Sequence, residues 1–249
     1  MTGIALADVA EALERADHEL VLRQTDAILA ERPGDDAAHE YRARALLALG
    51  RLDEAERHAK DAVRLDPDEI RYRELLAGIL SQDGAHRDAA AEFGRLARND
   101  PHQATWTVAE ARERIGASQP DMGVDAARRA VRLEPTNGEA QVTLSQALAR
   151  TGDARGALQA ATRAAELLSG DPAAREALAD AHWLAEEDAA AFAEFRALAD
   201  EVSGADRDRV VAKARALYGQ HAGPFGRLVA AVAPAFELAF SRGWLRIHR

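Results

Sequence analysis

The sequence contains no cysteine and few aromatic residues. The absence of cysteine excludes disulfide bonds, zinc or iron–sulfur sites with cysteine ligands, and catalysis by a thiol. Aromatic residues make up only 5% of the 249 residues, which argues against a β-sandwich. No uncharged apolar run reaches the roughly 18 residues that a transmembrane helix needs, and no basic region opens the N-terminus. We therefore expect neither a membrane span nor a secretory signal, and we predict a cytoplasmic protein.

Basic residues are fewer than acidic ones, so the formal net charge is -10 at pH 7. This balance argues against nucleic acid as the partner. Alanine, by contrast, is by far the most frequent residue of the chain. Because alanine has the highest helix propensity and a small side chain, this composition predicts an all-α protein of thin, closely packed helices.

Proline recurs at equal intervals along the chain, at Pro33, Pro67, Pro101 and Pro135, so the period is 34 positions. Proline ends a helix and disfavours helix in the residue before it, so each one predicts the end of a repeating unit. Each unit contains two amphipathic runs, separated near Gly50, Gly84 or Gly152. Three further columns keep the same period: Ala43, Ala77, Ala111, Ser145 and Ala179; Ala55, Ala89, Gly123, Ala157 and Ala191; and Ala62, Leu96, Ala130, Ala164 and Leu198.

The repeat resembles the tetratricopeptide repeat, as in AHEYRARALLALGRLDEAERHAKDAVRLDP, which ends at Pro67. The resemblance covers residues 2–205 as six units with this period. It implies a right-handed superhelical solenoid of six helix pairs, with the handedness taken from the family alone. Three units depart from the pattern. The first is shifted by about one position, the fourth has Pro120 where a turn glycine is usual, and the sixth lacks a proline after Leu198.

Residues 206–249 differ from the repeats in charge. They hold eight basic and three acidic residues, a net charge of +5, which leaves -15 on residues 1–205. Two further helices are expected, the second beginning at Pro224 and bending at Pro234. This second helix carries an apolar stripe, formed by Phe225, Val229, Val232, Phe236 and Phe240.

Three interpretations of residues 206–249 remain open from the sequence. The two helices could form a cap that covers the apolar face of the last repeat. Alternatively, residues 224–249 could contact an anionic membrane through a basic amphipathic helix, or they could dock on another protein. The apolar stripe favours the cap, whereas the basic end SRGWLRIHR favours the other two.

The resemblance also implies a binding groove lined by the first helix of each unit. Its register places ten residues in that lining: Glu40, Tyr41, Arg44, Arg71, Glu74, Gly78, Arg112, Gln146, Asp180 and Trp183. Some relatives use a lysine and asparagine clamp for a carboxy-terminal EEVD sequence. Here the clamp positions hold Glu40, Arg44 and Leu75, so we do not expect that specificity. Ordinary solvated helix faces, and burial of Trp106 and Trp183, are the alternatives.

The sequence offers no constellation for catalysis and no cofactor motif. It lacks a Walker A loop, GxGxxG, GxSxG and HExxH. His182 and Glu186 lie four positions apart, but no third ligand accompanies them, so we predict no metal site. We therefore predict a non-catalytic scaffold or adaptor that binds a protein or peptide partner through the groove. The alternative is a membrane-associated assembly factor that docks through its basic terminal helix. The oligomeric state stays open.

Overall fold

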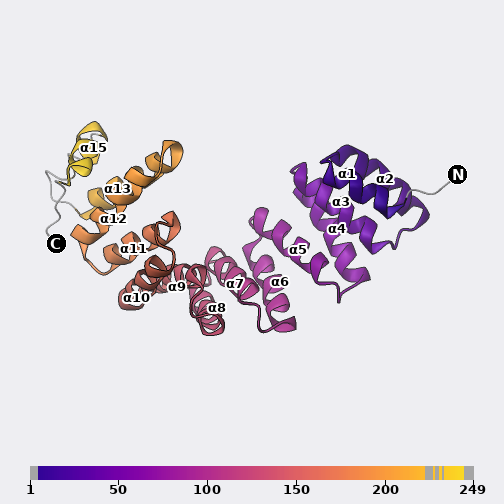
Figure 1. Ribbon diagram of the computed structural model, residues 1–249, viewed down its shortest axis with the longest axis horizontal. Helices are drawn as coiled ribbons and strands as arrows, with labels where there is room; N and C mark the ends of the chain where they lie inside the picture. Colours follow the sequence, from indigo (N-terminus) through magenta and orange to yellow (C-terminus); the bar gives the residue numbers. More distant parts are fainter. Residues whose placement is uncertain (1–4, 222–226, 228–229, 232, 244–249) are drawn as a thin grey trace. The chain divides into compact units, whose positions relative to one another are not determined.

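The computed structural model describes residues 5–221, 227, 230–231 and 233–243 (Figure 1). Every regular element among these residues is a helix, which confirms the all-α prediction. The chain divides into two compact units, residues 1–119 and 120–249. This division falls inside the fourth repeat, whereas the boundary near residue 205 that the charge pattern suggests stays a prediction.

The first unit contains seven described helices, and consecutive helices pack against one another. They are α1 (Leu6–Glu14), α2 (His18–Glu31), α3 (Asp36–Ala48), α4 (Leu52–Leu65), α5 (Ile70–Gln82), α6 (His86–Asn99) and α7 (Ala104–Gly116). The hydroxyl of Tyr72 on α5 donates to Asp36 Oδ2 on α3 at 2.7 Å, and so joins the first helices of neighbouring repeats.

The second unit contains seven described helices as well. They are α8 (Pro120–Leu133), α9 (Gly138–Thr151), α10 (Ala154–Leu167), α11 (Pro172–Leu184), α12 (Asp188–Glu201), α13 (Gly204–His221) and α15 (Ala233–Ser241). Helices α9 and α10 pair closely, as do α11 and α12, and α11 also contacts α9. No helix among the described residues is long and apolar enough to cross a membrane.

The helices begin and end at the positions that the period predicts. The last residues before the repeat prolines, such as Asp66 and Asp100, leave the helical conformation for an extended one. The next first helix then begins at a side-chain cap, where Asp35, Asn137 and Asp171 each accept a hydrogen bond from a backbone N–H three positions on.

A residue with left-handed backbone conformation separates the two helices of each repeat. These residues recur every 34 positions with φ between 56° and 81°: Ala16, Gly50, Gly84, Ser118, Gly152 and Glu186. The first repeat is therefore in register, and the shift of one position predicted for it is wrong. In the fourth repeat the turn position holds Ser118, and Pro120 is the first residue of α8.

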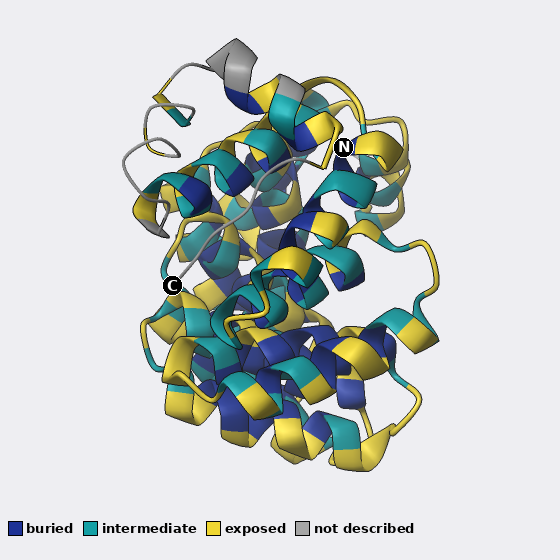
Figure 2. Cartoon of the chain, turned by 90° about the vertical axis from the view of Figure 1, so that its left-hand side faces the viewer, coloured by how far each residue is buried: buried dark blue, intermediate teal, exposed yellow. Residues whose placement is uncertain are grey.

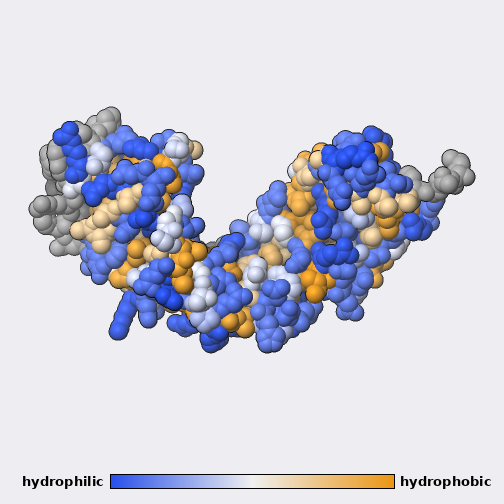
Figure 3. All heavy atoms as spheres, in the orientation of Figure 1, coloured by the Kyte–Doolittle hydropathy of each residue, from blue (hydrophilic) through white to orange (hydrophobic). Residues whose placement is uncertain are grey.

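The columns of small residues lie where helices cross. All fifteen positions are buried, and Ala89 and Ala157 are completely inaccessible, as the register predicts. Figure 2 colours buried residues dark blue, and they recur along the helices. Figure 3 shows hydrophilic side chains over most of the displayed surface, with hydrophobic ones gathered between the helices.

The helices beyond residue 205 bury apolar residues against α12. Val210, Ala214 and Tyr218 of α13 join Phe236 and Phe240 of α15 in one core cluster. The same cluster includes four buried residues of α12: Phe192, Phe195, Leu198 and Ala199. Of the predicted apolar stripe, Phe225, Val229 and Val232 lie outside the described residues, as does Pro224.

Candidate partner-binding faces

In residues 1–119 the candidate face is the exposed side of the first helices α3, α5 and α7, which we call the first-helix face. Arg44, Gly78 and Arg112 stand on it at the same position of consecutive repeats, and all three are exposed. The sequence predicted each of them in a binding groove. The structure thus places two guanidinium groups on either side of a glycine along consecutive first helices.

Neighbouring carboxylates hold Arg44 and Arg71 in place. Glu40 is buried, with 3% of its surface exposed, and accepts a hydrogen bond from Arg44 Nε at 2.6 Å. Glu40 therefore orients Arg44 and does not itself present a free charge. Arg71 forms a two-point contact with Glu69, at 3.1 Å for both bonds, at the start of α5.

The aromatic residues near this face belong mainly to the interior. Trp106 is buried, and its Nε1 donates to Glu74 Oε1 at 2.8 Å, so it links α7 to α5. Tyr41 is half-buried and packs against the core of the first repeats. Burial of Trp106, weighed above as the alternative to an anchor, is therefore confirmed.

The predicted lining residues of the second unit lie in different environments. Gln146 on α9 is exposed. Asp180 on α11 accepts a hydrogen bond from Lys213 Nζ of α13 at 2.7 Å. Trp183 is half-buried and packs edge-on against Phe192, with ring centroids 5.8 Å apart. Asp180 and Trp183 thus contact the chain's own terminal helices or core.

Basic residues of α13 also bind Glu176 on α11. Arg209 and Lys213 donate to its carboxylate at 2.9 and 2.8 Å. Burial acts to raise the pKa of Glu176, but these hydrogen bonds outweigh it and hold that pKa below its usual value. Burial raises the pKa of Asp180, although Lys213 opposes this effect. Lys213 therefore stabilises charge chiefly on Glu176.

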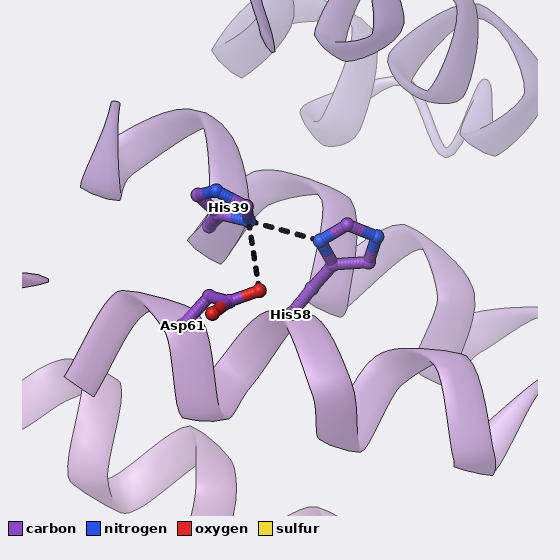
Figure 4. A group of neighbouring side chains, drawn as sticks. All are labelled: His39, His58 and Asp61. Atoms are coloured by element: carbon purple, nitrogen blue, oxygen red, sulfur yellow. Dashed lines mark hydrogen bonds and ion pairs between the residues drawn. The ribbon is translucent and has the colours of Figure 1, made fainter. Parts of the chain in front are cut away.

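A group of two histidines and an aspartate lies between α3 and α4 (Figure 4). His39 Nδ1 is 2.9 Å from His58 Nδ1 and 4.0 Å from Asp61 Oδ2. His39 Nε2 lies 3.1 Å from the carbonyl oxygen of Pro33, and Arg42 Nε donates to His58 Nε2 at 3.0 Å. The sequence did not single out these residues, although the spacing between His39 and His58 recurs in other repeats.

The hydrogen-bond pattern assigns the protons of both histidines. The Pro33 carbonyl requires a proton on His39 Nε2, so His39 Nδ1 accepts. Arg42 requires an unprotonated His58 Nε2, so His58 Nδ1 donates to His39. Binding a metal through both Nδ1 atoms would move the His58 proton to Nε2, where it would face the Arg42 donor. Burial, together with the charge of Arg42, lowers the pKa of His58 to about 4, so His58 stays neutral at pH 7. The arrangement therefore links α3 to α4 through hydrogen bonds.

The sequence pairs His182 with Glu186, but in the structure His182 contacts Glu187. Glu187 Oε2 lies 2.7 Å from His182 Nδ1. Glu186 itself occupies the left-handed turn between α11 and α12. Among the described residues, only the group of His39, His58 and Asp61 brings three potential metal ligands together.

Comparison with family models gives two matches, both described as tetratricopeptide repeat, over residues 5–79 and 108–172. Together they span more than half of the chain. These two matches, the paired helices and the buried columns together define the class of protein. The chain belongs to the tetratricopeptide repeat family. No curated protein sequence matches it significantly.

Solved structures share this fold at low sequence identity. A tetratricopeptide repeat protein from Parabacteroides merdae has 14% identity and a TM-score of 0.74, over 96% of this chain and 90% of its own. MamA from Desulfovibrio magneticus RS-1 has 20% identity and a TM-score of 0.58, over 65% and 91%. YrrB, described as having an unusual peptide-binding site, has 18% identity and a TM-score of 0.55, over 71% and 91%.

Proposed function

We propose that this protein is a non-catalytic scaffold that binds an extended segment of a partner protein on the first-helix face of residues 1–119. The observation that carries the proposal is the column of Arg44, Gly78 and Arg112. It combines exposed charge, repeated spacing and a missing side chain on three consecutive first helices.

Gly78 is costly for the helix that contains it. Glycine inside a helix destabilises it by about 0.5–1 kcal/mol relative to alanine. Many interior glycines are explained by a neighbour that leaves no room for Cβ, but a Cβ at Gly78 would meet nothing within 4 Å. The folded chain therefore gains nothing from the glycine, whereas a partner backbone can approach α5 closely there.

The two arginines define the chemistry of the segment. A guanidinium group binds a carboxylate through two parallel hydrogen bonds, which gives both affinity and orientation. Glu40 restrains Arg44, so less side-chain entropy is lost on binding. We propose that the bound segment carries carboxylates on either side of a residue that lies over Gly78.

The comparisons and the terminal helices support this function over the alternative. YrrB, which shares the fold, is described as having a peptide-binding site. The membrane alternative needs the apolar stripe to be exposed, yet Phe236 and Phe240 are buried in the core cluster with α12. Side chains inside this cluster have no apolar surface left for lipid.

The experiment is affinity capture from extracts of the native organism with matched variants. Arg44→Glu combined with Arg112→Glu reverses the charge of the column, and Arg98→Glu is the control because Arg98 is exposed on the second helix α6. The wild type and the control should capture the same partner, and the double variant should lose it. If all three proteins capture the same set, the proposed face is wrong.

A further inference from the structure

A polar pair links the first and second helices in three of the repeats. His39 contacts His58 at 2.9 Å. Arg73 Nη1 donates to Glu92 Oε2 at 2.8 Å, and Arg175 Nη1 donates to Glu194 Oε2 at 3.0 Å. The members of each pair are 19 positions apart, and the pairs repeat at multiples of 34. Each therefore occupies the same place in its repeat.

The corresponding pair between α9 and α10 is incomplete. Its residues are Gln141 and Ala160, and alanine has no polar atom to offer. Only 8% of Gln141 is exposed, and its side-chain amide forms no hydrogen bond with any part of the chain that the structure describes. The amide is open to the space beside it, since it is not among the fully enclosed unpaired polar atoms of the described residues. The first and fourth repeats are also incomplete, with Ala5 and Gln24 and with Thr107 and Ala126 at these positions.

An open cavity of about 620 Å³ lies beside Gln141 and Ala160. Val131, Leu144, Leu148 and Ala160 form its apolar side, and Gln159, Thr162 and Glu166 contribute to its polar side. One repeat further along, Arg175 and Glu194 line a smaller pocket of about 200 Å³, together with residues 168–171 of the preceding turn.

Charged side chains of both signs line the cavity. Arg128 of α8 lines it, is exposed, and forms no ion pair with the described residues. Arg163 also lines it, but Glu166 binds Arg163 Nη1 at 2.8 Å. Arg128 is therefore the cation available to a ligand, on a chain whose net charge is -10.

We infer that this cavity binds a ligand with an aliphatic body, an amide group and a carboxylate. The aliphatic body would contact Val131, Leu144 and Leu148. The carboxamide of Gln141 both donates and accepts, and the best complement to it is another amide. The guanidinium of Arg128 pairs with the carboxylate. The volume lies within the range of small-ligand sites. This site goes beyond the proposed function, because it shares no residue with the first-helix face.

The test is an NMR titration of the full chain with N-acetyl-L-leucine, a small probe that carries all three groups. Saturable shifts should appear at the Gln141 side-chain amide and at the methyl groups of Val131, Leu144 and Leu148. N-acetyl-L-leucine amide lacks the carboxylate and should bind at least about tenfold more weakly. Hexanoate lacks the amide and should also bind more weakly. No saturable shift at these groups, or equal binding of hexanoate, would overturn the inference.

Two variants test the residues. Gln141→Arg combined with Ala160→Glu recreates the pair of the next repeat, so it should close the cavity and abolish binding. Arg128→Gln changes an exposed side chain and should leave the fold intact, while removing the preference for the acid over its amide. If the Arg128 variant keeps that preference, the assigned carboxylate contact is wrong.

Two sources could supply this chemistry, a free acylated amino acid or the carboxy-terminus of a polypeptide. A second titration with Gly-Ser-Gly-Ser-Leu distinguishes them. Binding of both probes at the cavity supports a chain end as a ligand, and binding of N-acetyl-L-leucine alone supports a free small molecule. Loss of partner capture in the charge-reversal variants is independent of these results, so the two proposals can fail separately.

Discussion

Three of the six left-handed turn positions hold a residue other than glycine. Ala16, Ser118 and Glu186 have φ of 56°, 57° and 63°. A residue with a Cβ atom in this conformation destabilises the folded state by about 1–2 kcal/mol. Glycine avoids this steric cost, but it offsets part of the gain because it raises the conformational entropy of the unfolded chain. These positions are therefore local weak points in the turns of their repeats.

We predict that Ser118→Gly raises stability by about 0.5–1 kcal/mol. The reason is that glycine adopts the left-handed conformation without a steric penalty. Gly152→Ala is the matched opposite and should lower stability by about 1 kcal/mol, because Gly152 has φ of 81°. Thermal melting of both variants checks the pair. Equal melting temperatures for all three proteins would contradict the role given to these turns.

A second prediction at this scale concerns the small columns. Ala157 is fully buried, and its carbonyl oxygen accepts a hydrogen bond from the Ser145 hydroxyl at 3.0 Å. Helices α9 and α10 therefore approach closely there. Ala157→Leu should force them apart and cost about 1–3 kcal/mol. Arg155→Leu, at an exposed position on the same helix, should have little effect. A melting temperature unchanged by Ala157→Leu would refute the register.

At the scale of the element, His58 should make the contact of α3 with α4 depend on pH. In the unfolded chain His58 takes up a proton near pH 6.5, whereas in the fold its pKa is about 4. Its contribution is present above about pH 6.5 and is lost as the pH falls toward 4. His58 is half-exposed, so solvent screening limits the effect to about 1 kcal/mol.

The measurement is the melting temperature of the wild type and of His58→Gln from pH 7.5 to 4. Glutamine keeps a polar side chain at this position but does not titrate. The difference between the two proteins should shrink as the pH falls through this window, while carboxylate titration affects both alike. A constant difference would show that His58 does not stay neutral in the fold.

The helices beyond residue 205 provide a second test at this scale. We propose that residues 206–249 cap the last repeat and that apolar contacts hold them there. Phe236 is fully buried, so Phe236→Ala should cost about 3–5 kcal/mol. Lys213→Met removes the ion pairs with Glu176 and Asp180 and should cost about 1 kcal/mol. Chemical denaturation compares the two. A larger loss for Lys213→Met would mean that charge, and not the apolar stripe, holds the cap.

At the scale of the whole molecule, the proline period was sufficient to predict the helix pairs and the buried columns. Periodicity exposes such features because every repeat meets the same neighbours. It does not reveal what only one repeat does. The cavity beside Gln141 is lined in part by Ala160, and alanine is too common in this chain to stand out. The networks of His39 and Trp106 likewise depend on side-chain directions that sequence spacing alone does not give.

The absence of cysteine permits the most direct test of the central proposal, that a partner lies on the first-helix face. Gly78→Cys places a single thiol on α5 for a photoactivated cross-linker, and Arg98→Cys places one on the exposed side of α6 as the control. In an extract of the native organism, the linker at position 78 should capture one protein, through an acidic segment, and the linker at position 98 should not. Equal capture from both positions, or none from position 78 while the wild type still retains its partner, would contradict the account.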